Sequence, residues 1–135
     1  MKEPTLSLVV PCFNEQEAIR KFYEEANRVL AQMNLDACAE FVFVDDGSLD
    51  GTLETIKELL GKDKRVRFMS FSRNFGKEAA LQAGLAKASG QFTAVMDADL
   101  QAPPSLLPQM LDALLKEGFD CTATRRTTRK NEPLV

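Results

Sequence analysis

The chain has 135 residues, of which 44% are hydrophobic and 27% are charged, and its net charge is −3. This length suits one domain, and the composition is ordinary for a globular protein. The weak negative charge gives no electrostatic attraction to nucleic acid, so we expect no nucleic-acid partner. No apolar stretch approaches the roughly 18 to 20 residues that span a bilayer, and the N-terminus carries no signal-peptide pattern, so we expect this chain by itself to be soluble.

The sequence contains no histidine, which excludes Ser-His-Asp and Cys-His catalytic arrangements and a zinc site with histidine ligands. The three cysteines, Cys12, Cys38 and Cys121, have no CxxC spacing. Their odd number is typical of reduced thiols in a cytosolic compartment. Catalysis by this chain would therefore rely on carboxylates, amides, cations and bound metal.

Strand-like and helical patterns alternate along the chain. The strand-like runs are short, apolar at their centres and rich in valine and phenylalanine, as in strands covered on both faces. They are residues 6–12, 40–45, 65–71, 91–97 and 120–124. Apolar residues recur at helical spacing in residues 17–33, 53–60, 76–88 and 105–116. This alternation predicts right-handed βαβ crossovers, and hence an α/β fold with three α/β/α layers around a mostly parallel central sheet. Ligands of such sheets bind at the carboxyl ends of the strands, where strand order reverses.

Polar clusters follow the first two strands. Phe13 offers a flat apolar wall to a base or belongs to the core, and Asn14 offers a hydrogen-bonding side chain or caps the first helix. Asp45 and Asp46 are consecutive acids at the end of the second apolar run. A tight turn explains Gly47 but not the two acids, which favours a carboxylate that accepts hydrogen bonds from a nucleobase imide or a ribose.

Two further clusters follow the third and fourth strands. Gly76 and Lys77 begin the third helix, where backbone N–H groups and a positive charge could hold a diphosphate. Neither a Walker P-loop nor a GxGxxG follows the first strand, which argues against an ATPase or a dinucleotide-binding protein. Alternation places Asp97 and Asp99 on one side of an extended strand. With Gln101 they offer the oxygen donors that Mg²⁺, Ca²⁺ or Mn²⁺ prefers, and a solvated acidic turn is the alternative.

The end of the chain, residues 125–135, is basic and has no apolar periodicity. We expect this tail to be part of a longer chain, with a disordered natural terminus as the alternative. Arg125 and Arg126 could pair with acceptor or donor phosphates, or belong to a solvated basic tail.

Taken in order, these motifs resemble the family 2 glycosyltransferases, and within them most closely the dolichyl- or undecaprenyl-phosphate sugar transferases. The motifs that carry the resemblance are residues 9–15, 44–52, 73–77 and 97–104, and it covers roughly residues 5 to 126. The resemblance implies a GT-A, Rossmann-like fold that binds a nucleoside-diphosphate sugar and a divalent metal, Mg²⁺ or Mn²⁺. The expected nucleotide-sugar-binding core is residues 1–124, and residues 125–135 would begin an acceptor-binding region.

The resemblance also implies roles for individual residues. Pro11, Phe13 and Glu15 match the segment that contacts the nucleoside, and Asp46 matches the acid that reads the base. With the residues considered above, the expected nucleotide-sugar-binding set is Pro11, Phe13, Glu15, Asp46, Gly76, Lys77, Asp97 and Arg125. Asp97 and Asp99 match the catalytic metal and diphosphate motif, and the expected metal ligands are Asp99, Gln101 and Asp97. Ala102 departs from the pattern, because a histidine is common at this position.

The activity implied by the resemblance is inverting transfer of a sugar from a UDP- or GDP-sugar to a polyprenyl phosphate at the cytoplasmic face of the membrane. Such an acceptor is largely ionised at neutral pH, since its second pKa is about 6, and requires no strong general base. We expect this chain alone to bind the donor but to transfer the sugar poorly. The alternatives are a family 2 transferase acting on a saccharide or protein hydroxyl, and a non-catalytic binding module such as a receiver-like signalling domain. The sequence leaves open the nucleotide, the sugar and whether the chain forms a homo-oligomer.

Overall fold

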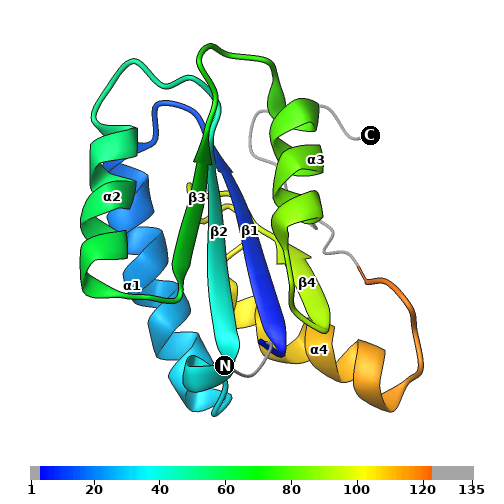
Figure 1. The fold of residues 1–135 in the computed structure, drawn as a ribbon. Helices are drawn as coiled ribbons and strands as arrows, with labels where there is room; N and C mark the ends of the chain where they lie inside the picture. The colour runs from blue at the N-terminus through cyan, green and yellow to red at the C-terminus, as the bar shows by residue number, and fades with distance from the viewer. Residues whose placement is uncertain (1–3, 123–135) are drawn as a thin grey trace, which may run out of the picture. The chain divides into compact units, whose positions relative to one another are not determined.

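The computed structural model describes residues 4–122, in which strands and helices alternate (Figure 1). In chain order the elements are β1 (Leu6–Cys12), α1 (Gln16–Gln32), the 3₁₀ turn η1 (Asp36–Cys38), β2 (Ala39–Asp45), α2 (Thr52–Lys62), β3 (Val66–Ser70), α3 (Lys77–Lys87), β4 (Phe92–Val95), the 3₁₀ turn η2 (Pro104–Leu106) and α4 (Leu107–Lys116). The chain divides into two compact units, residues 1–105 and 106–135.

The first unit is built on a parallel sheet with the strand order β3-β2-β1-β4. β1 is central, and its Val9 is in register with Val42 of β2 on one side and Val95 of β4 on the other. After β1 the chain adds strands on one side, and it then returns to the other side of β1 for β4. Strand order therefore reverses between β1 and β4, and the carboxyl ends of these two strands flank the place where ligands of such sheets bind.

The two faces of the sheet are covered by different helices (Figure 1). On the face toward α1, the stacked rings of Phe41 and Phe43 lie 5.9 Å apart. Phe22 of α1 packs edge-on against Phe43 with 6.4 Å between ring centroids. On the opposite face α3 approaches so closely that a Cβ atom built on its Gly84 would lie 2.5 Å from Val9 Cγ1. This arrangement confirms the predicted α/β fold with helices on both faces of a parallel sheet.

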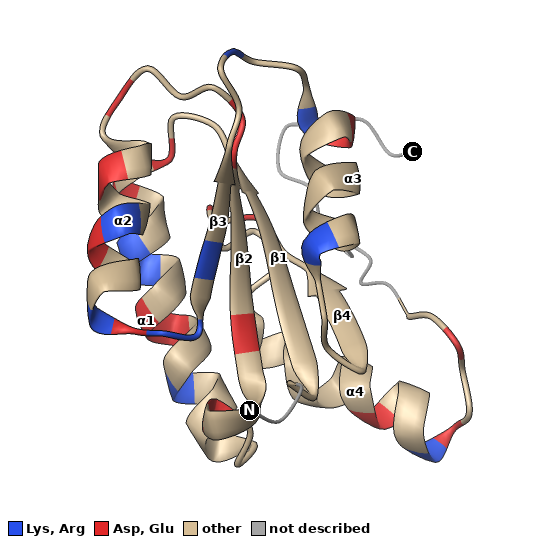
Figure 2. Ribbon diagram, viewed as in Figure 1, with Lys and Arg blue, Asp and Glu red and all other residues tan. Residues whose placement is uncertain are grey.

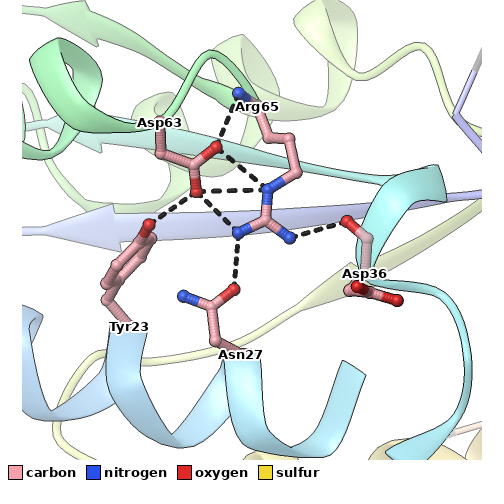
Figure 3. A network of polar contacts seen from close by, with 5 residues as sticks. All are labelled: Tyr23, Asn27, Asp36, Asp63 and Arg65. Carbon is pink, nitrogen blue, oxygen red and sulfur yellow. Dashed lines mark hydrogen bonds and ion pairs between the residues drawn. The ribbon is translucent and has the colours of Figure 1, made fainter. Parts of the chain in front are cut away.

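A polar network ties α1 to the segment that precedes β3 (Figure 3). The Asp63 carboxylate accepts hydrogen bonds from the Tyr23 hydroxyl at 2.5 Å and from the Arg65 guanidinium at 2.6 Å. The same guanidinium donates to the Asn27 side-chain oxygen at 2.6 Å and to the Asp36 carbonyl oxygen at 2.7 Å. Burial alone would raise the pKa of Asp63, but the hydrogen bonds from Arg65 and Tyr23 outweigh burial and lower it to about 2.

Two of the predicted strands differ from the structure. The fourth was expected over residues 91–97, but β4 covers only Phe92–Val95, because its ladder with β1 pairs only Leu6–Val9. The fifth was expected over residues 120–124. Residues 120–122 are not in a strand, and residues 123 and 124 lie outside the described part of the chain.

The second unit contains α4, in which Lys116 and Asp112 form an ion pair at 3.6 Å one turn apart. Within residues 4–122, no helix is long and apolar enough to cross a membrane. Cys12, Cys38 and Cys121 are all free thiols.

Candidate functional site

A pocket of about 250 Å³ opens at the carboxyl ends of the strands, in the first unit. Loops that follow the strands carry both acidic and basic segments (Figure 2). The lining residues come from the segments after β1, β2 and β4 and from the start of α3: Pro11, Cys12, Phe13, Glu15, Asp46, Lys77, Ala80, Asp97, Asp99 and Gln101. The pocket therefore lies where strand order reverses, as expected for the binding site of an α/β sheet.

Negative charge gathers on the side of the pocket formed by the β1 and β4 ends. The pKa of Glu15 is raised, first by burial and then by the negative charges of Asp99 and Asp97. Lys77 partly offsets this effect. A carboxylate whose pKa is raised by neighbouring negative charges is stabilised in its ionised form by a nearby cation. The electrostatics of this side therefore favour a cationic ligand.

Lys77 brings a positive charge to the same pocket from the first residue of α3. Its Nζ atom lies 2.8 Å from Asp97 Oδ1, and both side chains are partly exposed. Gly76 directly before it has φ +102° and ψ 158°, a conformation that is essentially restricted to glycine. This backbone leaves the N-terminus of α3 without a side-chain cap, so its N–H groups remain available to an anion.

Asp99 and Gln101 lie in a tight turn after β4. The Gln101 backbone N–H donates to Asp99 Oδ1 at 3.1 Å, and Leu100 between them has a left-handed φ of +63°. Among residues 4–122, no three His, Cys, Asp or Glu side chains are grouped so as to hold a metal ion by themselves. Mg²⁺-type sites commonly use one or two carboxylates and complete the shell with water and substrate phosphates. The donor chemistry of Asp99, Gln101 and Asp97 fits a cation of this kind.

Asp46 lines the pocket, but its carboxylate is directed to the loop before α3. Asp46 is 4% exposed, and its two carboxylate oxygens accept hydrogen bonds from residues 74–76. Of the two roles expected for Asn14, the structure shows hydrogen bonding and not capping of α1, whose N-cap is Glu15. The φ of Asn14 is +52°, its N–H donates to Ser48 Oγ at 2.9 Å, and its side-chain oxygen accepts the N–H of Leu49 at 2.9 Å. Both residues thus join neighbouring loops at the edge of the sheet.

The structure brings together most of the residues that the sequence singled out. The pocket includes eight of them: Pro11, Phe13, Glu15, Asp46, Lys77, Asp97, Asp99 and Gln101. Gly76 is adjacent as the N-cap of α3, and Arg125 lies outside the described residues. Sequence reasoning missed Cys12 and Ala80 in the lining. Ala80 lies three residues after Lys77, so helical spacing is the signal that could have found it.

Cys12 is a packing residue of the pocket floor. Its side chain is buried, and burial, together with the negative charges of Glu15, Asp45 and Asp97, raises the pKa of the thiol well above its ordinary value. Because the thiolate is the reactive form, this environment makes Cys12 a poor nucleophile.

The fold and the pocket define an α/β protein with a paired acidic and basic ligand site at the reversal of strand order, as in nucleotide-binding sheets. The chain belongs to glycosyl transferase family 2, whose family model matches residues 7–134. This membership confirms the predicted family and rules out the receiver-like alternative.

Relatives and solved structures agree with this assignment. The chain is 40% identical over 127 residues to the bactoprenol glucosyl transferase of Shigella phage SfV, covering 94% of this chain and 40% of that protein. It is 37% identical over 127 residues to the dodecaprenyl-phosphate galacturonate synthase of Rhizobium johnstonii, covering 93% of this chain and 37% of that protein. The chain thus spans about 40% of the length of the curated relatives it matches.

The fold resembles that of the mannosyltransferase PcManGT from Pyrobaculum calidifontis, solved in complex with GDP-Man and Mn²⁺. The TM-score is 0.69 at 23% sequence identity, over 85% of this chain and 33% of that chain. This likeness shows the GT-A fold that the sequence predicted.

Proposed function

We propose that this chain is the donor-binding part of a glycosyltransferase that moves a sugar from a nucleoside diphosphate to a polyprenyl phosphate, with inversion at the sugar carbon. The observation that carries the proposal is the pocket itself, because it places Asp97, Asp99 and Gln101 together with Lys77 at the reversal of strand order. A nucleoside-diphosphate sugar needs both charges: cations for its diphosphate and oxygen acceptors for its ribose and sugar hydroxyls.

The nucleoside half of the donor would contact the segment after β1. Phe13 is 44% exposed at the pocket, so its ring is accessible for stacking with a base. Pro11 extends this apolar wall, and Glu15 offers a carboxylate to ribose hydroxyls. The diphosphate would then lie toward the N-terminus of α3, where Lys77 and free backbone N–H groups favour an anion.

Asp99 and Gln101 would hold a divalent cation, Mg²⁺ or Mn²⁺, with Asp97 as a third donor. Such a cation supplies Lewis-acid stabilisation of the negative charge that grows on the departing diphosphate. Two or three protein donors suffice, because the phosphates themselves complete the coordination. Lys77 then has a second role, since the ammonium that neutralises Asp97 in the free protein can turn to a phosphate in the complex.

The acceptor is proposed from the relatives, whose names include bactoprenol glucosyl transferase and dodecaprenyl-phosphate galacturonate synthase. A lipid phosphate is mostly ionised at neutral pH, so its oxygen attacks without a strong general base. A chain without histidine is suited to such an acceptor. The acceptor would approach at the cytoplasmic face of a membrane, and Arg125 stays a predicted phosphate contact.

Calorimetry with UDP-glucose and GDP-mannose, each with and without Mn²⁺, tests the donor site. We expect one donor to bind only when Mn²⁺ is present, and Asp99→Ala to weaken that binding by at least about tenfold, because a metal ligand is lost. Asp112→Ala is the matched control, since Asp112 is an exposed aspartate of α4, and it should leave the affinity unchanged. Metal-independent binding that Asp99→Ala does not alter would exclude the proposed site.

The acceptor class needs a separate assay. Transfer to undecaprenyl phosphate in detergent is compared with transfer to saccharide and protein hydroxyls, using the donor identified by calorimetry. We expect weak or no transfer by the 135-residue chain to any acceptor. Robust transfer to the lipid phosphate would contradict the expectation that this chain alone only binds the donor, and transfer to a hydroxyl would support the alternative acceptor class.

A further inference from the structure

Two opposite charges of the pocket, Lys77 and Asp97, are paired with each other. The Lys77 ammonium donates to Asp97 Oδ1 at 2.8 Å, although the two residues come from different elements. Lys77 begins α3, whereas Asp97 follows β4. Among residues 4–122, each of these side chains makes this one hydrogen bond. A single contact therefore decides whether either charge is available to a ligand.

The place of Lys77 at the start of α3 is unfavourable for the helix itself. The N-terminus of a helix carries partial positive charge, so a cation there weakens the helix unless an anion lies nearby. Gly76 before it offers no side-chain cap. In this structure the Asp97 carboxylate is that anion. A diphosphate would serve the same ammonium better, because it carries more negative charge than one carboxylate.

The ion pair is of a kind that exchanges readily. The Lys77 side chain is 61% exposed and that of Asp97 is 41% exposed. Water screens pairs as exposed as this one, so they contribute little to stability. By contrast, the pair of Arg65 and Asp63 is 25% and 12% exposed and lies within the network of Figure 3. Lys77 can therefore leave Asp97 for a stronger anion without disturbing the packing of the sheet.

The charge of Lys77 also acts on the acidic side of the pocket. It lowers the pKa of Glu15, which Asp99 and Asp97 raise. We propose that Lys77 is a charge switch, whose ammonium holds Asp97 before the donor binds and moves to the diphosphate afterwards, which frees Asp97 for the divalent cation. The chain then disfavours a cation alone and accepts it together with the diphosphate. This inference rests on the proposed function, since it requires a diphosphate at the start of α3.

A double-mutant cycle on Lys77 and Asp97 separates this switch from a general effect of charge. Lys77→Met keeps the apolar stem and removes the ammonium, and Asp97→Asn removes the negative charge at nearly the same size. The two variants and the double variant are titrated with Mn²⁺ alone, followed by the EPR signal of the free ion. They are also titrated with inorganic pyrophosphate in the presence of EDTA, followed by calorimetry. Lys116→Met is the matched control, because Lys116 forms an exposed pair with Asp112 and neither residue lines the pocket.

The switch predicts coupling in both titrations. Lys77→Met should raise the affinity for Mn²⁺ alone by up to about fivefold, the worth of an exposed ion pair, and by clearly less when Asp97 is already replaced. Asp97→Asn should strengthen the binding of metal-free pyrophosphate by a similar factor, and by clearly less when Lys77 is already replaced. Lys116→Met should change neither affinity.

Effects of the same size in both backgrounds would show that the two charges act independently, and would overturn the switch. If Asp97→Asn abolishes Mn²⁺ binding, the pyrophosphate cycle decides. UDP and GDP, each with Mn²⁺, test the proposed function separately on the unmodified chain. If one of them binds and neither cycle shows coupling, only the switch fails. If none of the probes binds, the proposed function and the switch both fail.

Discussion

Glu40 is a buried charge whose removal should make the stability of this protein less dependent on acid. It lies on β2 at the end of the sheet opposite the pocket, in register with Ser7 of β1. Its carboxylate accepts hydrogen bonds from the Ser7 hydroxyl at 2.5 Å, the Ser89 N–H at 2.7 Å and the Arg67 guanidinium at 2.8 Å. The Ser7 oxygen in turn accepts the Gly90 N–H at 2.8 Å. One carboxylate thus joins three strands to the segment that leaves α3.

The size of the effect follows from the pKa of Glu40. Burial alone would raise this pKa, but the hydrogen bonds from Ser7, Ser89 and Arg67 outweigh burial and lower it from 4.5 to about 2. Because the folded-state pKa is the lower one, the stabilisation is complete well above pH 4.5 and is lost as the pH falls toward 2. At roughly 1.4 kcal/mol for each pH unit between the two values, the ionised group contributes about 3 kcal/mol at pH 7. Less than half of this remains at pH 3.

Urea unfolding of the wild type and of Glu40→Gln, at pH 7 and at pH 3, measures this contribution. We expect Glu40→Gln to lower the free energy of unfolding by about 3 kcal/mol at pH 7 and by about 1 kcal/mol at pH 3. Asp63 titrates in the same range, but it is present in both proteins and cancels in their difference. Glu58→Gln is the control, because Glu58 pairs with Arg20 at the surface and should contribute at most about 1 kcal/mol. A gap of equal size at both pH values would refute the electrostatic reasoning.

Further predictions concern backbone packing at glycines and the network of Figure 3. Thermal unfolding should show that Gly84→Ala destabilises the protein by about 1–3 kcal/mol, because the added Cβ would lie 2.5 Å from a methyl group of a buried valine. Gly61→Ala should stabilise the protein by about 0.5–1 kcal/mol, because the added Cβ would meet nothing within 4 Å. By the same assay Gly47→Ala should be destabilised, since its φ of +73° and the 2.3 Å approach to the next loop's backbone both oppose a side chain. Tyr23→Phe removes a hydrogen bond at 2.5 Å and should cost about 1 kcal/mol. NMR titration should then show a higher pKa for Asp63 in Tyr23→Phe than in the wild type, because the hydrogen bond from Tyr23 helps to lower this pKa.

The sequence predicted the elements whose pattern is set by burial alone. β1 and β2 are buried along their whole lengths, and the apolar runs of the sequence placed them to within about one residue. The length of β4 was overestimated because Met96 continues the apolar run of the sequence. In the structure the Met96 N–H still donates to the carbonyl oxygen of Val9, but Met96 itself lies beyond the end of the strand. The run of residues 120–124 was expected to form a fifth strand, but residues 120–122 are not in a strand, and residues 123 and 124 lie outside the described part of the chain. Strand pairing depends on neighbours that a local pattern does not contain.

The candidate site was predictable in position but not in detail. Its residues follow strands of a parallel sheet, and the topology alone brings those strand ends to one edge. What the sequence could not reveal is how the loops meet each other. The carboxylate of Asp46 is occupied by a loop about thirty residues later, and Asn14 adopts a left-handed conformation to bridge to Ser48 instead of capping a helix. Contacts of this kind depend on the three-dimensional path of both loops, for which Gly47 and Gly76 are the only local signs.

The reversal of strand order explains how the pocket collects acidic and basic side chains from different elements. α1 and α3 leave the sheet on opposite faces, so the ends of β1 and β4 are left without a crossover between them. The acids after β4 enter this gap from one strand, whereas Lys77 enters from a helix that begins after β3. The ion pair between Lys77 and Asp97 at 2.8 Å links these groups directly, and the hydrogen bonds of Asp46 hold the loop that leads to Lys77. The separation of charges in the pocket is therefore set by side-chain contacts beyond the strand ends, and not by the ladder of the sheet itself.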